Sequence, residues 1–153
     1  MINTILEKLN SIILSLIFGG SIGVLFSVLT NIHIAKLSGI AVKVAANNNA
    51  PIFIAFSKFL LILGLAFLIL SLITKNIRRK LMVSLPIILC ILSIMLFSLY
   101  IAPQMDLLRP QLTSSETARL TFESLHKLSQ FDFSLIILTS LICLVQLPIK
   151  KTG

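Results

Sequence analysis

Four long runs of apolar residues alternate with short polar segments along the chain. The runs cover about residues 9–32, 51–74, 81–105 and 131–149. As an α-helix, each run is long enough to cross most or all of the roughly 30 Å hydrocarbon core of a bilayer. The pattern therefore predicts an all-α protein, an integral membrane four-helix bundle that forms a single domain over residues 1–153.

Two further segments alternate between apolar and polar positions at helical spacing. Residues 34–46 place Lys36 and Lys43 on one face and apolar residues on the others, which predicts a short interfacial helix after the first span. The segment from Glu116 onward predicts an amphipathic helix that leads into the fourth span, with N-cap residues at 113–115 before it.

Glycines and prolines add detail to the first and third spans. Gly19 and Gly23 have the four-residue spacing that lets membrane helices approach closely, and we interpret them as helix-packing positions. Pro86 and Pro103 lie near the two ends of the third run, so we expect them to bracket that helix.

The amino-acid composition indicates that the chain is surrounded by lipid. The sequence is 57% apolar and only 12% charged, whereas a soluble domain carries roughly 25% charged residues. The net charge of +8 comes from cations clustered at the ends of the apolar runs. That placement suits a lipid bilayer with anionic headgroups, and no nucleic-acid partner is expected. The cations are clustered most tightly near the two ends of the chain and between the second and third spans. This distribution predicts a multi-pass protein of a bacterial inner membrane with both termini cytoplasmic.

The sequence offers little support for catalysis. Cys90 and Cys143 lie inside apolar runs without C-x-x-C spacing, and we interpret them as small residues at helix contacts. Ser129 and His126 lack an accompanying G-x-S-x-G element. We therefore expect no catalytic residues, no cofactor and no bound metal.

The polar chemistry of the chain is concentrated in one stretch. Four of the five acidic residues and one of the two histidines lie between Asp106 and Asp132. Within it, Arg119, Glu123 and His126 follow one another at helical spacing on one stripe, and an intrahelical Arg119–Glu123 pair is expected. Glu123-x-x-His126 also has the spacing of di-iron helix bundles, although one copy in four helices is a weak signal.

Other charged residues are predicted at the same depth, on the non-cytoplasmic side. Arg109 follows the third span, Asp132 opens the fourth and Lys58 enters the second. Because charges near hydrocarbon are costly unless paired, we expect Lys58 or Arg109 to pair with Asp132 or Asp106. The full candidate polar cluster consists of Lys58, Arg109, Arg119, Glu123, His126 and Asp132.

These residues resemble those of the TMEM205-like family (DUF4149) of four-span membrane proteins. The shared elements are a glycine pair and a V-L-F element in the first span, a proline and an arginine that end the third span, and an F-x-x-L-H-x-x-S pattern before the fourth. Here these are Gly19-Gly20, Val24-Leu25-Phe26, Pro103, Arg109, Phe122, Leu125, His126 and Ser129. The resemblance implies the four-span fold over most of the chain and brings no established reaction.

Two positions depart from the family pattern. Gly23 stands where the family often has a proline, and Asp132 stands where an asparagine is common. The second departure argues against carrying a neutral hydrogen-bonding role over to Asp132.

Three functional hypotheses follow. The favoured one is a non-enzymatic membrane module whose polar cluster binds a partner, a lipid headgroup or a small solute, because none of the four runs carries a mid-membrane acid or base. One alternative is a membrane redox or metal-handling module that uses His33 and His126, which are predicted at the same interface. The other is a small-molecule or cation exporter that acts as an oligomer. The expected protein partners are another membrane protein or further copies of this chain.

Overall fold

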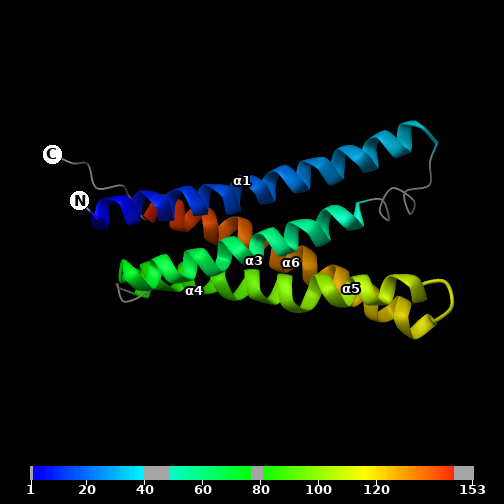
Figure 1. Ribbon diagram of the computed structural model, residues 1–153. Helices are drawn as coiled ribbons and strands as arrows, with labels where there is room; N and C mark the ends of the chain where they lie inside the picture. Colours follow the sequence, from blue (N-terminus) through cyan, green and yellow to red (C-terminus); the bar gives the residue numbers. More distant parts are fainter. Residues whose placement is uncertain (1, 40–48, 77–80, 147–153) are drawn as a thin grey trace.

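The computed structural model describes residues 2–39, 49–76 and 81–146. Helices α1 (Ile2–Leu37), α3 (Ala50–Ile73), α4 (Leu81–Leu96) and α6 (Glu116–Gln146) lie side by side in an elongated bundle (Figure 1). The third span continues beyond α4 through the π-helical turn η2 (Phe97–Ile101), α5 (Ala102–Leu108) and the 3-10 turn η3 (Arg109–Gln111). The described residues form no strand. The predicted all-α fold class is confirmed.

The bundle has two distinct ends. We call the end that holds Ile2, Ile73, Leu81 and Gln146 the terminal end, and the end that holds Leu37, Ala50 and Glu116 the loop end (Figure 1). Four helical stretches, residues 2–37, 50–73, 81–111 and 116–146, are long and apolar enough to cross a membrane. The chain therefore has the composition and geometry of a multi-pass membrane protein.

Of the two predicted amphipathic segments, the second is an extension of a longer helix, and so is the start of the first. Residues 34–37 continue α1 without a break, and the rest of the predicted interfacial helix, from residue 40, lies outside the described residues. The segment from Glu116 runs directly into the fourth span as one helix, α6. At its start, the Ser115 hydroxyl accepts a hydrogen bond of 3.2 Å from the Ala118 amide, which caps the helix.

The third span passes through both of its prolines, contrary to the expectation that they bracket it. Pro86 lies inside α4, and Pro103 lies in the first turn of α5, directly after η2. Within η2 the helix is widened, so that the Ala102 amide bonds to the carbonyl of Phe97 instead of the usual i−4 carbonyl. Since a proline clashes with the carbonyl four residues before it, this widening lets the helix continue past Pro103.

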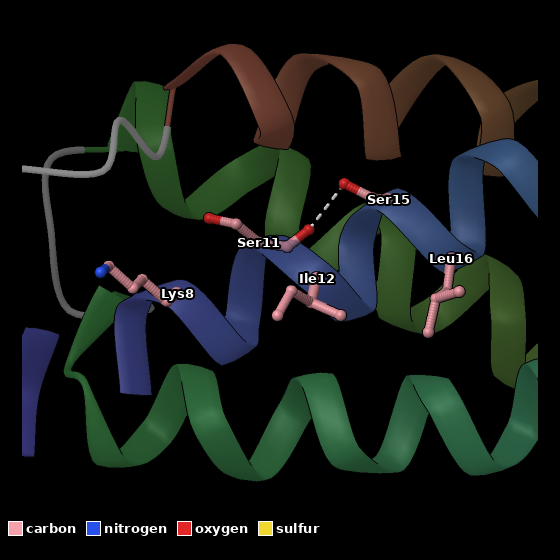
Figure 2. Close-up of a pocket in the computed structure, with 5 residues that line it drawn as sticks. All are labelled: Lys8, Ser11, Ile12, Ser15 and Leu16. Atoms are coloured by element: carbon pink, nitrogen blue, oxygen red, sulfur yellow. Dashed lines mark hydrogen bonds between the residues drawn. The ribbon is translucent and has the colours of Figure 1, made fainter. Parts of the chain in front are cut away.

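One face of α1 points away from the bundle. Gly19 and Gly23 have open space where a Cβ would stand, so the packing expected at them is absent within the described chain. Gly20 packs instead, because a Cβ there would lie 3.1 Å from the Phe56 ring of α3. Nearer the terminal end this face has a shallow hollow, which is lined by Lys8, Ser11, Ile12, Ser15 and Leu16 (Figure 2). Within it, the Ser15 hydroxyl donates a hydrogen bond to the Ser11 carbonyl.

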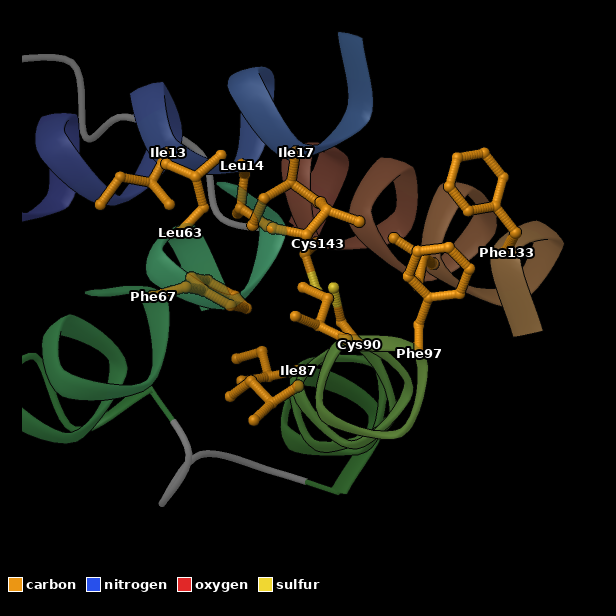
Figure 3. Packing of buried hydrophobic residues seen from close by; sticks show 14 of the residues in the cluster. Ile13, Leu14, Ile17, Leu63, Phe67, Ile87, Cys90, Phe97, Phe133 and Cys143 are labelled. Carbon is orange, nitrogen blue, oxygen red and sulfur yellow. The ribbon is translucent and has the colours of Figure 1, made fainter. Parts of the chain in front are cut away.

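The core is a continuous layer of aliphatic and aromatic side chains between the helices (Figure 3). Each span contributes side chains without solvent exposure: Leu14 and Ile17 from α1, Leu60 and Phe67 from α3, Ile87 and Ile94 from α4, and Ile136 from α6. Large apolar side chains also cover the outside, such as Phe26, Ile62 and Leu138, which are 68%, 66% and 55% exposed. Helices that are apolar on all sides belong in lipid.

Candidate polar site in the bundle interior

The acidic residue Asp132 lies inside the bundle, not at its surface. Its side chain is 3% exposed and projects from the middle of α6. At the usual helical rise it lies about 20 Å from Gln146, where α6 ends at the terminal end of the bundle. Asp132 is therefore an acid in the interior of the helix bundle, well away from that end. The expectation that none of the four runs carries a mid-membrane acid or base stays a prediction.

The carboxylate of Asp132 has one polar neighbour from another helix. The Ser93 hydroxyl of α4 lies within hydrogen-bonding reach of it, whereas Oδ2 of Asp132 has no hydrogen-bond partner among the described residues. Ser93 is itself buried, 4% exposed. A buried carboxylate oxygen without a partner is costly, which makes this position stand out from the apolar core.

Phenylalanine rings pack around Phe133, the residue that follows Asp132 in α6. The Phe133 ring lies 6.2 Å from the ring of Phe53 and 6.1 Å from that of Phe56, both on α3, measured between ring centroids. On the third span, the η2 residue Phe97 places its ring centroid 5.5 Å from that of Phe133. Three spans therefore meet in one aromatic cluster, made of Phe53, Phe56, Phe97 and Phe133.

The predicted ion pairs with Asp132 or Asp106 do not form. Lys58 is exposed on α3, and Nε of Arg109 has no hydrogen-bond partner in the described chain. Asp106 is exposed on α5. No salt bridge joins Lys58 or Arg109 to either acid. The prediction failed because it placed these groups at one depth, whereas the Asp132 side chain is buried between the helices, Lys58 is exposed and Arg109 is only half-buried.

The predicted stripe on α6 is exposed and separate from Asp132. Arg119 pairs with Glu116, three residues earlier, and not with Glu123 as expected. His126 stacks on the Phe122 ring, and its Nε2 lies 3.2 Å from the Gln130 side-chain nitrogen. Arg119, Glu123 and His126 are all exposed, so they form an outer polar face and no enclosed site.

No metal centre is assembled by the described residues. They contain no group of three or more His, Cys, Asp or Glu side chains arranged to hold an ion. His33, near the end of α1, and His126 on α6 are both exposed, and no hydrogen bond or ring contact joins them. The buried polar atoms of Asp132 and Ser93 are both oxygens, which suit protons and hard cations better than transition metals.

Comparison with known protein families, curated proteins and solved structures found no match to this chain. The resemblance to the TMEM205-like family therefore stays a prediction.

Proposed function

We propose that this protein is a non-enzymatic multi-pass membrane protein that binds a monovalent cation, a proton or an alkali-metal ion, at Asp132. The proposal rests on one observation, a buried carboxylate with an unpartnered oxygen and no basic partner in the described chain. In a low-dielectric interior such a group is neutralised by a proton or faces a cation. The proposed binding site is therefore Asp132 in the bundle interior, and not the exposed stripe on α6.

The surroundings of Asp132 favour a single positive charge. α4 carries no acidic or basic residue, and Lys58 on α3 and Asp106 on α5 are exposed. Arg109 on η3 is half-buried and forms no ion pair with Asp132. The Asp132 carboxylate and the Ser93 hydroxyl that contacts it supply oxygen ligands with a single negative charge. One negative charge balances a proton or an alkali-metal ion, whereas a divalent ion would need further carboxylates.

We further propose that the terminal end of the bundle faces the cytoplasm of a cell membrane and contacts anionic headgroups there. The support is the sequence distribution of cations, which are closely clustered before the first apolar run, between the second and third runs and after the fourth: Lys8, Lys75, Arg78, Arg79, Lys80, Lys150 and Lys151. In that orientation, a cation that enters from the terminal end would reach Asp132 from the cytoplasmic side of the membrane.

The test uses the purified full-length protein in lipid nanodiscs. Wild type is expected to show one of two signatures: the infrared carbonyl band of a protonated carboxyl group, or a melting temperature that rises with Na⁺ or K⁺ but not with N-methylglucamine. An ion present at about 100 times its Kd stabilises the folded state by roughly 2.7 kcal/mol. Asp132→Asn abolishes whichever signature is present. Ser93→Ala weakens alkali-ion binding by about tenfold, since a hydrogen bond to a charged group contributes roughly 1.5–3 kcal/mol.

Asp106→Asn is the matched control, because Asp106 is an exposed acid of the same type on α5. It is expected to leave both signatures unchanged. The carbonyl band identifies the cation as a proton, and the alkali-ion effect identifies a metal ion. Wild-type protein that shows neither signature, or Asp132→Asn protein that keeps the wild-type one, contradicts the proposal.

A further inference from the structure

A line of buried polar side chains runs from Asp132 toward the terminal end of the bundle. It follows the contact between α4 and α6, the most extensive helix pair in the bundle. Seven residues, or two helical turns, after Asp132 comes Thr139, which hydrogen-bonds to Cys90 of α4, one turn from Ser93. Ser140 is buried beside Thr139, and one turn further Cys143 directs its thiol toward that of Cys90 (Figure 3).

Near the terminal end several buried polar atoms lack partners among the described residues. Asn10 of α1 is 1% exposed, and neither its side-chain oxygen nor its nitrogen has a hydrogen-bond partner in the described chain. The same holds for the Ser71 hydroxyl of α3 and for Oε1 of Gln146 in the last turn of α6. Buried amides and hydroxyls are normally hydrogen-bonded to protein or water, so this end of the core is suited to hydration.

Toward the loop end, buried polar atoms without partners also occur, Nδ2 of Asn49 before α3 and Nε of Arg109 on η3, but aromatic rings gather there as well. Phe97 lies one turn beyond Ser93 in that direction, and its ring belongs to the aromatic cluster with Phe53, Phe56 and Phe133. Beyond these rings, the buried side chains of α5 and of the first half of α6 are Ala102, Ala118 and Leu125, all apolar. At the level of the rings, the π turn buries the Ser98 hydroxyl, which has no partner in the described chain.

We infer that Asp132 exchanges its cation with the terminal end only, along the line Ser93, Cys90, Thr139, Ser140 and Cys143, and that the aromatic cluster blocks the opposite route. This inference rests on the proposed function. It adds the direction of access: the line supplies hydroxyl and thiol groups that can solvate a moving cation, and the rings supply none.

The two native cysteines report on the line directly. A thiol buried in apolar surroundings is inert toward thiol reagents, whereas a thiol on a hydrated path reacts. The probe is 2-aminoethyl methanethiosulfonate, a small cation that forms a mixed disulfide with the thiol and releases methanesulfinate. In nanodiscs, Cys90 in the Cys143→Ala protein is expected to react, as measured by mass spectrometry. A cysteine placed by Ser98→Cys, with both native cysteines changed to alanine, is expected to react more slowly by roughly tenfold or more.

A plug variant gives the second readout. Cys143→Leu fills the line on the terminal side of Cys90, so it should slow labelling of Cys90 by about tenfold, while Ser98→Leu should not change it. Melting temperatures verify that each variant is folded. An unreactive Cys90, or equal rates at Cys90 and at the Ser98→Cys thiol, overturns the one-sided route. Labelling as expected in a protein without either Asp132 signature would leave the path standing and refute only the cation site.

Discussion

Replacing Phe133 by alanine is expected to lower the free energy of unfolding by about 2–4 kcal/mol, from the loss of three ring contacts and the cavity that remains. The Phe133 side chain is 7% exposed, and its ring meets those of Phe53, Phe56 and Phe97 from two other spans. In lipid, helices associate through van der Waals packing and not through release of water. Lost ring contacts therefore weaken the bundle directly.

Phe131 provides the matched control for this substitution. It is the same residue type two positions earlier in α6, but its side chain is 69% exposed and points out of the bundle. Phe131→Ala is expected to change stability by less than about 0.5 kcal/mol. Unfolding by detergent titration in mixed micelles measures both variants. Equal losses for the two would show that the aromatic cluster does not hold the spans together.

Much of the fold was predictable because it depends on the apolar composition of long segments of the sequence. Four long apolar runs, which contain only two charged residues, Lys58 and Asp132, admit few arrangements in a bilayer other than helices. The prolines were less predictable. Pro86 and Pro103 were expected to bracket the third span, but a π turn accommodates Pro103, and such a turn leaves no clear mark in the sequence.

The orientation of Asp132 was missed, although a signal for it exists. Seven-residue steps along α6 join Ala118, Leu125, Asp132 and Thr139, all of which are buried. That periodicity assigns Asp132 to the inner face. The concentration of charges between Asp106 and Asp132 favoured the other grouping, in which Asp132 belongs with Arg119, Glu123 and His126, and these three residues are exposed.

The partners of these residues could not be read from sequence. Ser93 faces Asp132 only because of the register between α4 and α6, which the intervening turns set and no local pattern specifies. Arg119 can reach an acid three residues before it or four residues after it on the same helix, since both spacings bring side chains together. The structure pairs it with Glu116, and the choice depends on side-chain rotamers.

Gly64 lies at a tight contact between α3 and α4, where Ile94 leaves no room for a larger side chain. Gly64→Ala is therefore expected to destabilise the bundle by about 1–3 kcal/mol through overpacking. A Cβ at residue 64 would stand 2.6 Å from Cγ2 of Ile94, a distance that real Cβ atoms do not adopt. Ile94 has no solvent exposure, and its β-branched side chain is stiff, so it cannot simply turn away. Gly19→Ala is the control, because nothing lies within 4 Å of a Cβ there.

A rescue experiment identifies the clash as the cause. Leucine has the volume of isoleucine but no Cγ2, so Ile94→Leu removes the atom that a Cβ at residue 64 would strike and should cost less than about 1.5 kcal/mol alone. The double variant Gly64→Ala/Ile94→Leu is expected to lose clearly less stability than the two single variants combined, a coupling typical of residues in direct contact. Additive losses in detergent titration would mean that Gly64 is needed for another reason, such as a backbone shift along the whole α3–α4 contact.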